Sequence, residues 1–365
     1  MSRPPLFVIR RFFLGITTSC NMRCSYCFVR RRDESMSYEE AKKCLLAFMR
    51  NFDRNCLLYF YGGEPFLCFG LMRRLVPFFY SAAHRAGKSP RVLVVTNGTI
   101  LTIPMLRFLK HSRIKIMVSF SGAPKIHDGW RRFKNNGRGT FSRIRKNVDA
   151  LLEHLPGEDV WVSHTFVPAM LSTFEEDVAR YEKMGFTNFH FEPVQFVAGV
   201  RWSGAAVARY EKALTRTYRR IKDRISRGNA LFSSNLIRHL EILLGISPPL
   251  GGAYDLYNNI RIWPKYRAGF SHFLINEDRA APQGAPPGGR AQAVFSGSRN
   301  RQERQGACFD FSQPGQAGSL RHGSGRRIWA CYNTVCRSAA ADLIRSSYED
   351  PRFGQYIREA LVRAI

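Results

Sequence analysis

The chain has 365 residues, with 56 Lys and Arg against 28 Asp and Glu, which gives a formal net charge of +28. Hydrophobic residues make up 45% of the sequence and charged residues 23%, a composition that supplies a large core and excludes a mainly disordered chain. No uncharged apolar run of about 18 residues and no N-terminal signal peptide is recognisable, so we expect a cytoplasmic protein. Three of its nine cysteines lie within eight positions, which favours metal or redox chemistry over a secreted disulfide framework.

Between residues 10 and 200, short β-rich runs alternate with amphipathic helical stretches. The expected strands are Phe12–Thr17, Leu57–Tyr61, Val92–Thr96, Ile114–Phe120, Val160–Val167 and Asn188–Glu192. The expected helices are Ser37–Phe52, which opens with a capping box, Leu71–Ala86, Met105–Lys110, Phe141–His154 and Thr173–Met184. Six strand–helix units in succession predict an α/β fold with a parallel sheet, either open or closed into a barrel, within residues 8–200. In both arrangements the chemistry is expected at the carboxyl ends of the strands.

The composition changes along the second half of the chain. Residues 201–280 are expected to form a helical connection, with helices near 205–227 and 233–245. Residues 281–307 are rich in Gly, Pro and Arg and predict a linker or a disordered insertion. Residues 308–365 are expected to form a short tail that contains cysteines and ends in a helix near Tyr356–Arg363.

Cys20, Cys24 and Cys27 form a C-x3-C-x2-C triplet directly after the first predicted strand. Three thiolates at this spacing can bind three irons of a 4Fe–4S cluster, and the fourth iron is then open to a chelating small molecule. A structural zinc site would need a fourth ligand, and no second C-x2-C or H-x3-H pair lies nearby. The triplet therefore predicts an iron–sulfur site.

This triplet, with Tyr26 before its third cysteine, resembles the signature of the radical S-adenosylmethionine (SAM) superfamily. The resemblance continues after later predicted strands, at Gly62-Gly63-Glu64-Pro65, Thr96-Asn97-Gly98 and Ser119-Phe120-Ser121-Gly122. In the last of these, Ser121 replaces the usual Asp of the family. His127-Asp128-Gly129-Trp130-Arg131 is similar to the family's H-D-x-x-R element, whose Arg approaches the SAM carboxylate. A solvated surface charge is the alternative for Arg131.

The resemblance implies a partial (β/α)6 barrel in which Cys20, Cys24 and Cys27 hold the 4Fe–4S cluster. It implies a SAM site lined by Gly62, Gly63, Glu64, Pro65, Thr96, Asn97, Ser119 and Arg131. It further implies reductive cleavage of SAM to a 5′-deoxyadenosyl radical, with a protein such as flavodoxin or ferredoxin as the reductant. The expected positions of His164, Glu192 and Gln195 are in the mouth of the barrel, although no role follows from the sequence and a satisfied core residue is the alternative for His164. The catalytic acid or base cannot be named.

Together with Gly137-Arg138-Gly139-Thr140-Phe141, these elements look most similar to the branch that includes anaerobic sulfatase-maturating enzymes and ribosomal-peptide maturases, which implies a peptide or protein substrate. That branch often carries a C-terminal SPASM domain with further clusters, and Cys308, Gly325 and Cys331 approximate its pattern, followed by Cys336. One auxiliary cluster held by Cys308, Cys331 and Cys336 with one other ligand is one interpretation, and a truncated or decayed tail is the other. The remaining cysteines, Cys44, Cys56 and Cys68, are expected to be small buried hydrophobic residues.

The charge of +28 leaves other functions open. It suggests a radical SAM enzyme that modifies nucleic acid. A steep salt dependence of RNA binding would favour this alternative. A non-catalytic relative that binds a peptide is suggested by Ser121 and by the reduced tail. A diffusely basic surface without a dedicated anionic partner would also account for the charge.

Overall fold

The computed structural model describes residues 9–29, 32–194, 200–246, 259–264, 267–269 and 323–363. The predicted linker at residues 281–307, together with Gln195 and Cys308, lies outside the described residues. The chain divides into two compact units. The first comprises residues 1–20, 28–94 and 251–321, and the second comprises residues 21–27, 95–250 and 322–365.

The strands of the first unit run in the order β9-β8-β1-β2-β3. They are β1 (Ile9–Thr17), β2 (Phe52–Gly62), β3 (Arg91–Thr96, of which residues 91–94 belong to this unit), β8 (Asn259–Trp263) and β9 (Arg267–Gly269). The strands β8, β1, β2 and β3 pair in parallel, and β9 pairs antiparallel with β8. The helices of this unit are α1 (Tyr38–Phe48) and α2 (Phe69–Arg85), with the short 3-10 helices η1 (Met49–Asn51) and η2 (Pro65–Cys68).

The elements of the first unit follow local signals in the sequence. Helix α1 begins with the predicted capping box, because the Glu40 N–H donates to Ser37 Oγ at 3.1 Å and the Ser37 N–H donates to Glu40 Oε2 at 2.8 Å. Within the described residues, Pro65–Arg85 is the one helical stretch long and apolar enough to cross a membrane by length and composition. Apolar side chains of α2 such as Leu75 and Phe79 are buried in the core.

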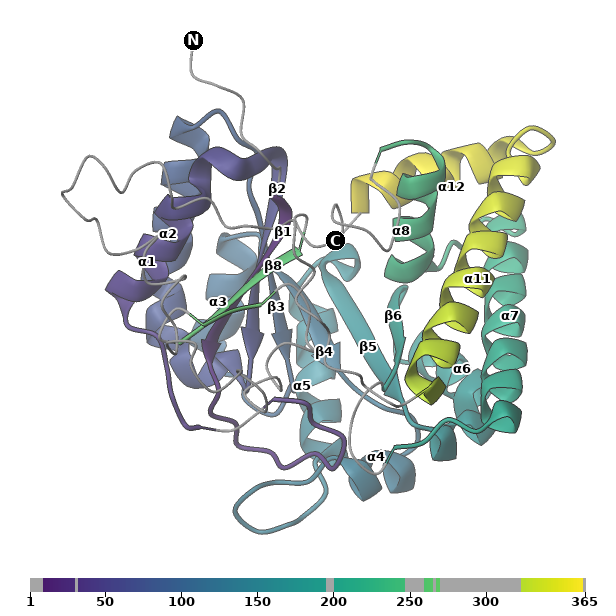
Figure 1. The fold of residues 1–365 in the computed structure, drawn as a ribbon, viewed down its shortest axis with the longest axis horizontal. Coiled ribbons are helices and arrows are strands. Elements are labelled where there is room, and N and C mark those ends of the chain that lie inside the picture. The colour runs from purple at the N-terminus through teal and green to yellow at the C-terminus, as the bar shows by residue number, and fades with distance from the viewer. Residues whose placement is uncertain are drawn as a thin grey trace. The chain divides into compact units, whose positions relative to one another are not determined.

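The strands of the second unit are β4 (Lys115–Ser119), β5 (Val160–Phe166), β6 (Asn188–Pro193) and β7 (Phe232–Ser233). They lie in chain order, and each pairs in parallel with the next. The helices are α3 (Ile103–His111), α4 (Pro124–Trp130), α5 (Phe141–His154), α6 (Phe174–Lys183), α7 (Gly204–Ser226), α8 (Ser234–Leu243), α11 (Gly323–Ser346) and α12 (Pro351–Arg363), with the 3-10 helices η3 (Gly157–Asp159) and η4 (Pro168–Thr173). Helix α11 lies alongside α7 and contacts α8, as Figure 1 shows in yellow-green and teal.

The succession of β/α units from β1 to β6 confirms the predicted α/β class and its partial (β/α)6 barrel. The predicted strands and helices are all present, with bounds that differ by a few residues. Three strands and two helices were not predicted, namely β7, β8, β9, α4 and α11. Their absence from the prediction has a physical reason, because the short strands and α4 offer too few residues for a periodic pattern.

Candidate active site: the cysteine loop and the strand ends

In the first unit, the end of β2 is joined closely to the chain that follows β1. The Gly63 N–H donates to Thr17 O at 2.8 Å, and the Glu64 N–H donates to Ser19 O at 2.8 Å. A Cβ atom on Gly63 would lie 2.0 Å from Ser19 O, so this position accepts only glycine. Gly63 therefore allows the chain to approach itself at the residue before Cys20.

The remaining residues of this predicted motif shape the turn. Gly62 has a positive φ of 129°, which glycine adopts without strain. Glu64 is fully buried, and its Oε1 accepts a hydrogen bond from the Phe66 N–H at 3.1 Å at the start of η2. Pro65 begins η2, where its missing N–H costs no hydrogen bond.

In the second unit, the segment that carries Cys24 and Cys27 lies along the segment that carries Arg131. Three backbone hydrogen bonds of 2.8–3.0 Å join the two segments, from the Arg23 N–H to Arg132 O, from the Ser25 N–H to Trp130 O and from the Lys134 N–H to Asn21 O. Since these bonds occur at alternate residues, they pair the two segments in the manner of antiparallel strands, with Met22 opposite Phe133.

Side chains hold the beginning of the same segment. The Asn97 amide donates to Asn21 Oδ1 at 2.8 Å, and the Asn21 amide donates to Thr99 Oγ1 at 2.8 Å. The Thr99 N–H and hydroxyl both donate to Asn97 Oδ1, at 2.8 and 2.6 Å. Asn97, predicted to line the SAM site, thus also anchors the cysteine segment, while Thr96 Oγ1 accepts the Gly98 N–H at 3.0 Å.

Arg131 is buried next to the cysteine segment. Its guanidinium Nη1 donates to the Tyr26 hydroxyl at 3.0 Å, and that hydroxyl lies 3.4 Å from Ser121 Oγ. Arg131 is 5% exposed, Tyr26 6% and Ser121 0%, so Arg131 is not a solvated surface charge. Ser121, which replaces the usual Asp of the family motif, therefore takes part in a neutral contact with Tyr26.

The other residues of the H-D-x-x-R element hold the backbone around Arg131. His127 Nδ1 accepts a hydrogen bond from the Ser121 N–H at 3.2 Å, and its Nε2 lies 3.0 Å from Thr140 Oγ1. Since the Thr140 hydroxyl donates to Arg131 O at 3.0 Å, it accepts from the His127 Nε2–H, which defines the tautomer. Burial, followed by the charge of Arg131, lowers the pKa of His127 to about 2.

Asp128 caps the next helix. Its Oδ1 accepts a hydrogen bond from the Phe141 N–H at 2.8 Å, at the first residue of α5. A Cβ on Gly139 would lie 2.1 Å from the Asp128 carboxyl carbon, so this cap needs glycine at that position. The sequence did not reveal this role or that of Thr140, although both residues lie in or beside motifs noted there.

Two of the residues expected in the barrel mouth, His164 and Glu192, lie in the described part of the chain. His164 is fully buried: its ring stacks on Phe166 of the same strand with centroids 3.8 Å apart, and its Nδ1 lies 2.9 Å from the hydroxyl of Tyr181 on α6. Burial, together with the charge of Arg131, lowers the pKa of His164 to about 3, so the alternative of a buried core residue is the correct one. Glu192 is half-buried, and its Oε2 lies 3.5 Å from His190 Nε2.

The two C-terminal cysteines that the structure describes lie on α11. Cys331 and Cys336 are five positions apart, which is about 140° around a helix, so they face different directions. Cys336 Sγ is 3.1 Å from the Tyr218 hydroxyl in the core. Burial raises the pKa of Cys336 to about 12 and that of Cys331 to about 11, which disfavours the thiolate form. An auxiliary cluster at these positions stays a prediction.

The thiols of Cys20, Cys24 and Cys27 suit an iron–sulfur cluster better than the other cysteine thiols of the described chain do. Cys20 and Cys24 are half-buried and Cys27 is exposed, whereas Cys44 and Cys56 are buried as predicted and burial raises their pKa values to about 12 and 11. The same prediction is wrong for Cys68, which is half-buried, with its Sγ 3.5 Å from Ser35 Oγ. As the chain stands, no three His, Cys, Asp or Glu side chains among the described residues lie close enough to hold a metal ion. The triplet provides three accessible thiols on one loop, which is the chemistry that iron requires.

Comparison with known proteins supports this assignment. Residues 14–183 match the family model of the radical SAM superfamily. The chain is 27% identical over 175 residues to the antilisterial bacteriocin subtilosin biosynthesis protein AlbA of Bacillus subtilis, covering 46% of this chain and 34% of that protein. It is 26% identical over 165 residues to a serine-type anaerobic sulfatase-maturating enzyme of Bacteroides thetaiotaomicron, covering 41% and 37%.

Among solved structures, native anSMEcpe with bound AdoMet and Cp18Cys peptide is similar in fold, with a TM-score of 0.58 at 17% identity over 67% of this chain and 68% of that one. The chain spans less than half the length of the curated relatives that it matches. The similarity to the radical SAM superfamily is therefore shown for residues 14–183 of the chain.

Proposed function

We propose that this protein is a radical SAM enzyme that modifies a side chain of a peptide or protein. The observation that carries the proposal is the attachment of the cysteine segment to the segment that holds the buried Arg131. The relatives support the substrate class, since one is a bacteriocin biosynthesis protein, one matures a sulfatase, and the similar solved structure contains AdoMet and a peptide.

In this proposal Cys20, Cys24 and Cys27 hold a 4Fe–4S cluster. When bound, the cluster and SAM would supply a 5′-deoxyadenosyl radical that abstracts a hydrogen atom from the substrate. The SAM site consists of the strand-end residues predicted from the sequence, which are Gly62, Gly63, Glu64, Pro65, Thr96, Asn97, Ser119 and Arg131.

Arg131 is the residue suited to the carboxylate of SAM. A guanidinium can donate two parallel hydrogen bonds to a carboxylate, and burial strengthens such a pair. His127 and His164 remain neutral close to it, because burial and the charge of Arg131 both oppose their protonation. Positive charge at this place is therefore carried by Arg131 and does not vary with pH in the physiological range.

The proposed enzyme works in the cytoplasm, where the reducing environment keeps cysteines as thiols. It receives electrons from a small protein such as a flavodoxin or a ferredoxin. None of the eight described cysteines forms a disulfide, which is compatible with this location.

Anaerobic reconstitution with iron and sulfide tests the proposal. The wild type should acquire 4Fe–4S absorbance and, with a reductant, convert SAM to 5′-deoxyadenosine. Cys24→Ala should lose both properties, while Cys68→Ala, which removes a half-buried thiol outside the triplet, should keep them. A wild type without the cluster, or a Cys24→Ala protein that cleaves SAM as well as the wild type, would show the proposal to be wrong.

The substrate class needs a separate test. A short peptide encoded beside this gene, prepared with deuterium on its side chains, should transfer deuterium to 5′-deoxyadenosine. If SAM is cleaved but deuterium moves only from nucleic acid, the peptide part of the proposal fails while the radical chemistry stands.

A further inference from the structure

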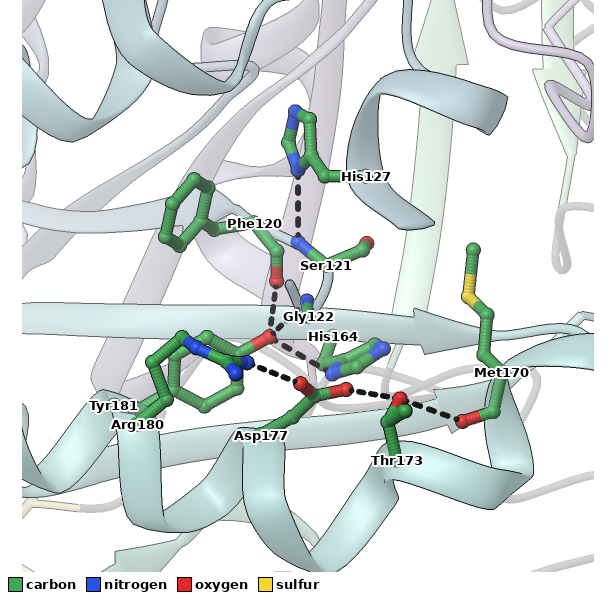
Figure 2. A network of polar contacts seen from close by, with 10 residues as sticks. All are labelled: Phe120, Ser121, Gly122, His127, His164, Met170, Thr173, Asp177, Arg180 and Tyr181. Carbon is green, nitrogen blue, oxygen red and sulfur yellow. Dashed lines mark hydrogen bonds and ion pairs between the residues drawn. The ribbon is translucent and has the colours of Figure 1, made fainter. Parts of the chain in front are cut away.

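The loop Phe120–Gly122, which connects β4 to α4, is held by side chains from two helices (Figure 2). From α4, His127 Nδ1 accepts the Ser121 N–H at 3.2 Å. From α6, the Tyr181 hydroxyl accepts the Gly122 N–H at 2.7 Å and donates to Phe120 O at 2.9 Å. A single hydroxyl therefore bridges the two ends of the loop.

The same hydroxyl links the loop to β5. A phenol has one proton, and because Phe120 O accepts it, the contact of 2.9 Å with His164 requires that His164 Nδ1–H is the donor. His164 is neutral, so this one tautomer satisfies every partner of Tyr181. The Tyr181 hydroxyl thus donates one hydrogen bond, to Phe120 O, and accepts two, from the Gly122 N–H and from His164 Nδ1–H.

Helix α6 holds this arrangement rigidly. Gly122 has a positive φ of 67°, and a Cβ there would lie 2.6 Å from Asp177 Oδ2. The Asp177 carboxylate is itself fixed, because it accepts hydrogen bonds from the Thr173 hydroxyl at 3.0 Å and from the Arg180 guanidinium at 2.8 Å. Figure 2 shows these side chains of α6 and of the preceding turn around Gly122.

The loop is connected to residues that are assigned to the SAM site. Its Ser121 and Gly122 N–H groups already donate hydrogen bonds within the protein. Ser119 precedes the loop, and Ser121 Oγ contacts Tyr26, which in turn accepts a hydrogen bond from Arg131. A shift of the loop would move the groups assigned to SAM.

We propose that Tyr181 is a positioning residue for SAM binding, acting through the backbone of Phe120 and Gly122. This inference rests on the proposed function. The Tyr181 hydroxyl holds the loop that orients Ser119, Ser121 and, through Tyr26, Arg131.

The test compares three Tyr→Phe variants of the reconstituted holoenzyme. Tyr181→Phe removes the bridging hydroxyl. Tyr210→Phe removes an equally buried hydroxyl that has no hydrogen-bond partner among the described residues. Tyr356→Phe removes a buried hydroxyl that donates to Leu231 O at 3.1 Å, far along the chain on α12. Equilibrium dialysis with radiolabelled SAM measures the Kd, absorbance measures the cluster, and thermal unfolding measures stability.

Tyr181→Phe should bind SAM about 10-fold more weakly, which corresponds to about 1.4 kcal/mol, while its cluster content stays that of the wild type. Tyr356→Phe should lower thermal stability without changing the Kd more than about twofold, and Tyr210→Phe should change neither property. Equal SAM affinity in Tyr181→Phe and wild type would overturn the positioning role, as would an equal weakening in Tyr356→Phe. A wild type that acquires its cluster but does not bind SAM would instead overturn the proposed function and, with it, this role.

Discussion

Lowering the pH is expected to destabilise the fold through His127 and His164, because both are buried in the neutral form. Burial lowers their pKa values to about 2 and 3, whereas in the unfolded chain each returns to its ordinary value of 6.5. The unfolded state therefore binds more protons than the folded state below pH 6.5. The stability contributed by the neutral histidines is complete above that pH and is lost progressively as the pH falls.

The magnitude follows from these values. At about pH 5, protonation favours the unfolded state by about 2 kcal/mol for each histidine relative to about pH 7.5. Asp177 acts in the opposite direction, since burial raises its pKa to about 6 and the folded state binds its proton first. Its protonation stabilises the fold by about 1.4 kcal/mol at about pH 5. These three groups together predict a net loss of about 2.5 kcal/mol.

Urea unfolding of cluster-free protein at the two pH values, followed by circular dichroism, isolates the contribution of His127. In His127→Asn, the amide oxygen can accept the Ser121 N–H in place of Nδ1, and no ionisable group remains. Whatever the variant costs at the higher pH, its loss of stability on acidification should be smaller than that of the wild type by about 2 kcal/mol.

His154 provides the matched control, since it is exposed on α5. His154→Asn should lose as much stability on acidification as the wild type. The reasoning is refuted if His127→Asn does the same, because His127 would then accept a proton within the fold, and the hydrogen bonds assigned to its neutral ring would be incorrect.

Two further substitutions test the attachment of the cysteine loop. Gly63→Ala places a Cβ 2.0 Å from Ser19 O and should cost several kcal/mol of stability and most of the iron bound per chain. The control is Gly70→Ala, which has no atom within 4 Å of the new Cβ. In thermal unfolding it should be neutral or slightly stabilising, and an iron assay should find the wild-type iron content. Asn21→Ala removes the hydrogen bond from the Asn97 amide to Asn21 Oδ1, so we expect a loss of about 1–3 kcal/mol and faster bleaching of the cluster absorbance in air. Bleaching at the wild-type rate would contradict the anchoring role.

Much of the fold could be predicted because its signals are local. The capping box of Ser37 and Glu40 lies within one helical turn, and α5 begins and ends at the predicted residues, Phe141 and His154. The expectation that Cys44 and Cys56 are core residues was also correct, since a cysteine within an apolar periodic pattern is usually buried.

Strand β8 could not be predicted in the same way. It pairs in parallel with β1, with Arg11 opposite Asn259, so nearly the whole barrel sequence separates the two partners. A strand of five residues carries too short a pattern to reveal its partner. The 24-residue helix α11 was also missed, because its first turn contains two glycines, which are poor helix formers.

The sequence by itself predicted where the chemistry lies, since the cysteine triplet and the motifs after the strands are recognisable from residue type and spacing. Only the tertiary structure decided what each motif residue holds: Asn97 anchors Asn21, and Arg131 is buried against Tyr26. Tyr181 belongs to no motif, yet its hydroxyl accepts a hydrogen bond from the N–H of Gly122, 59 residues earlier in the chain. Hydrogen-bond partners so far apart are chosen by the packing of helices on the sheet, and no local pattern encodes that choice.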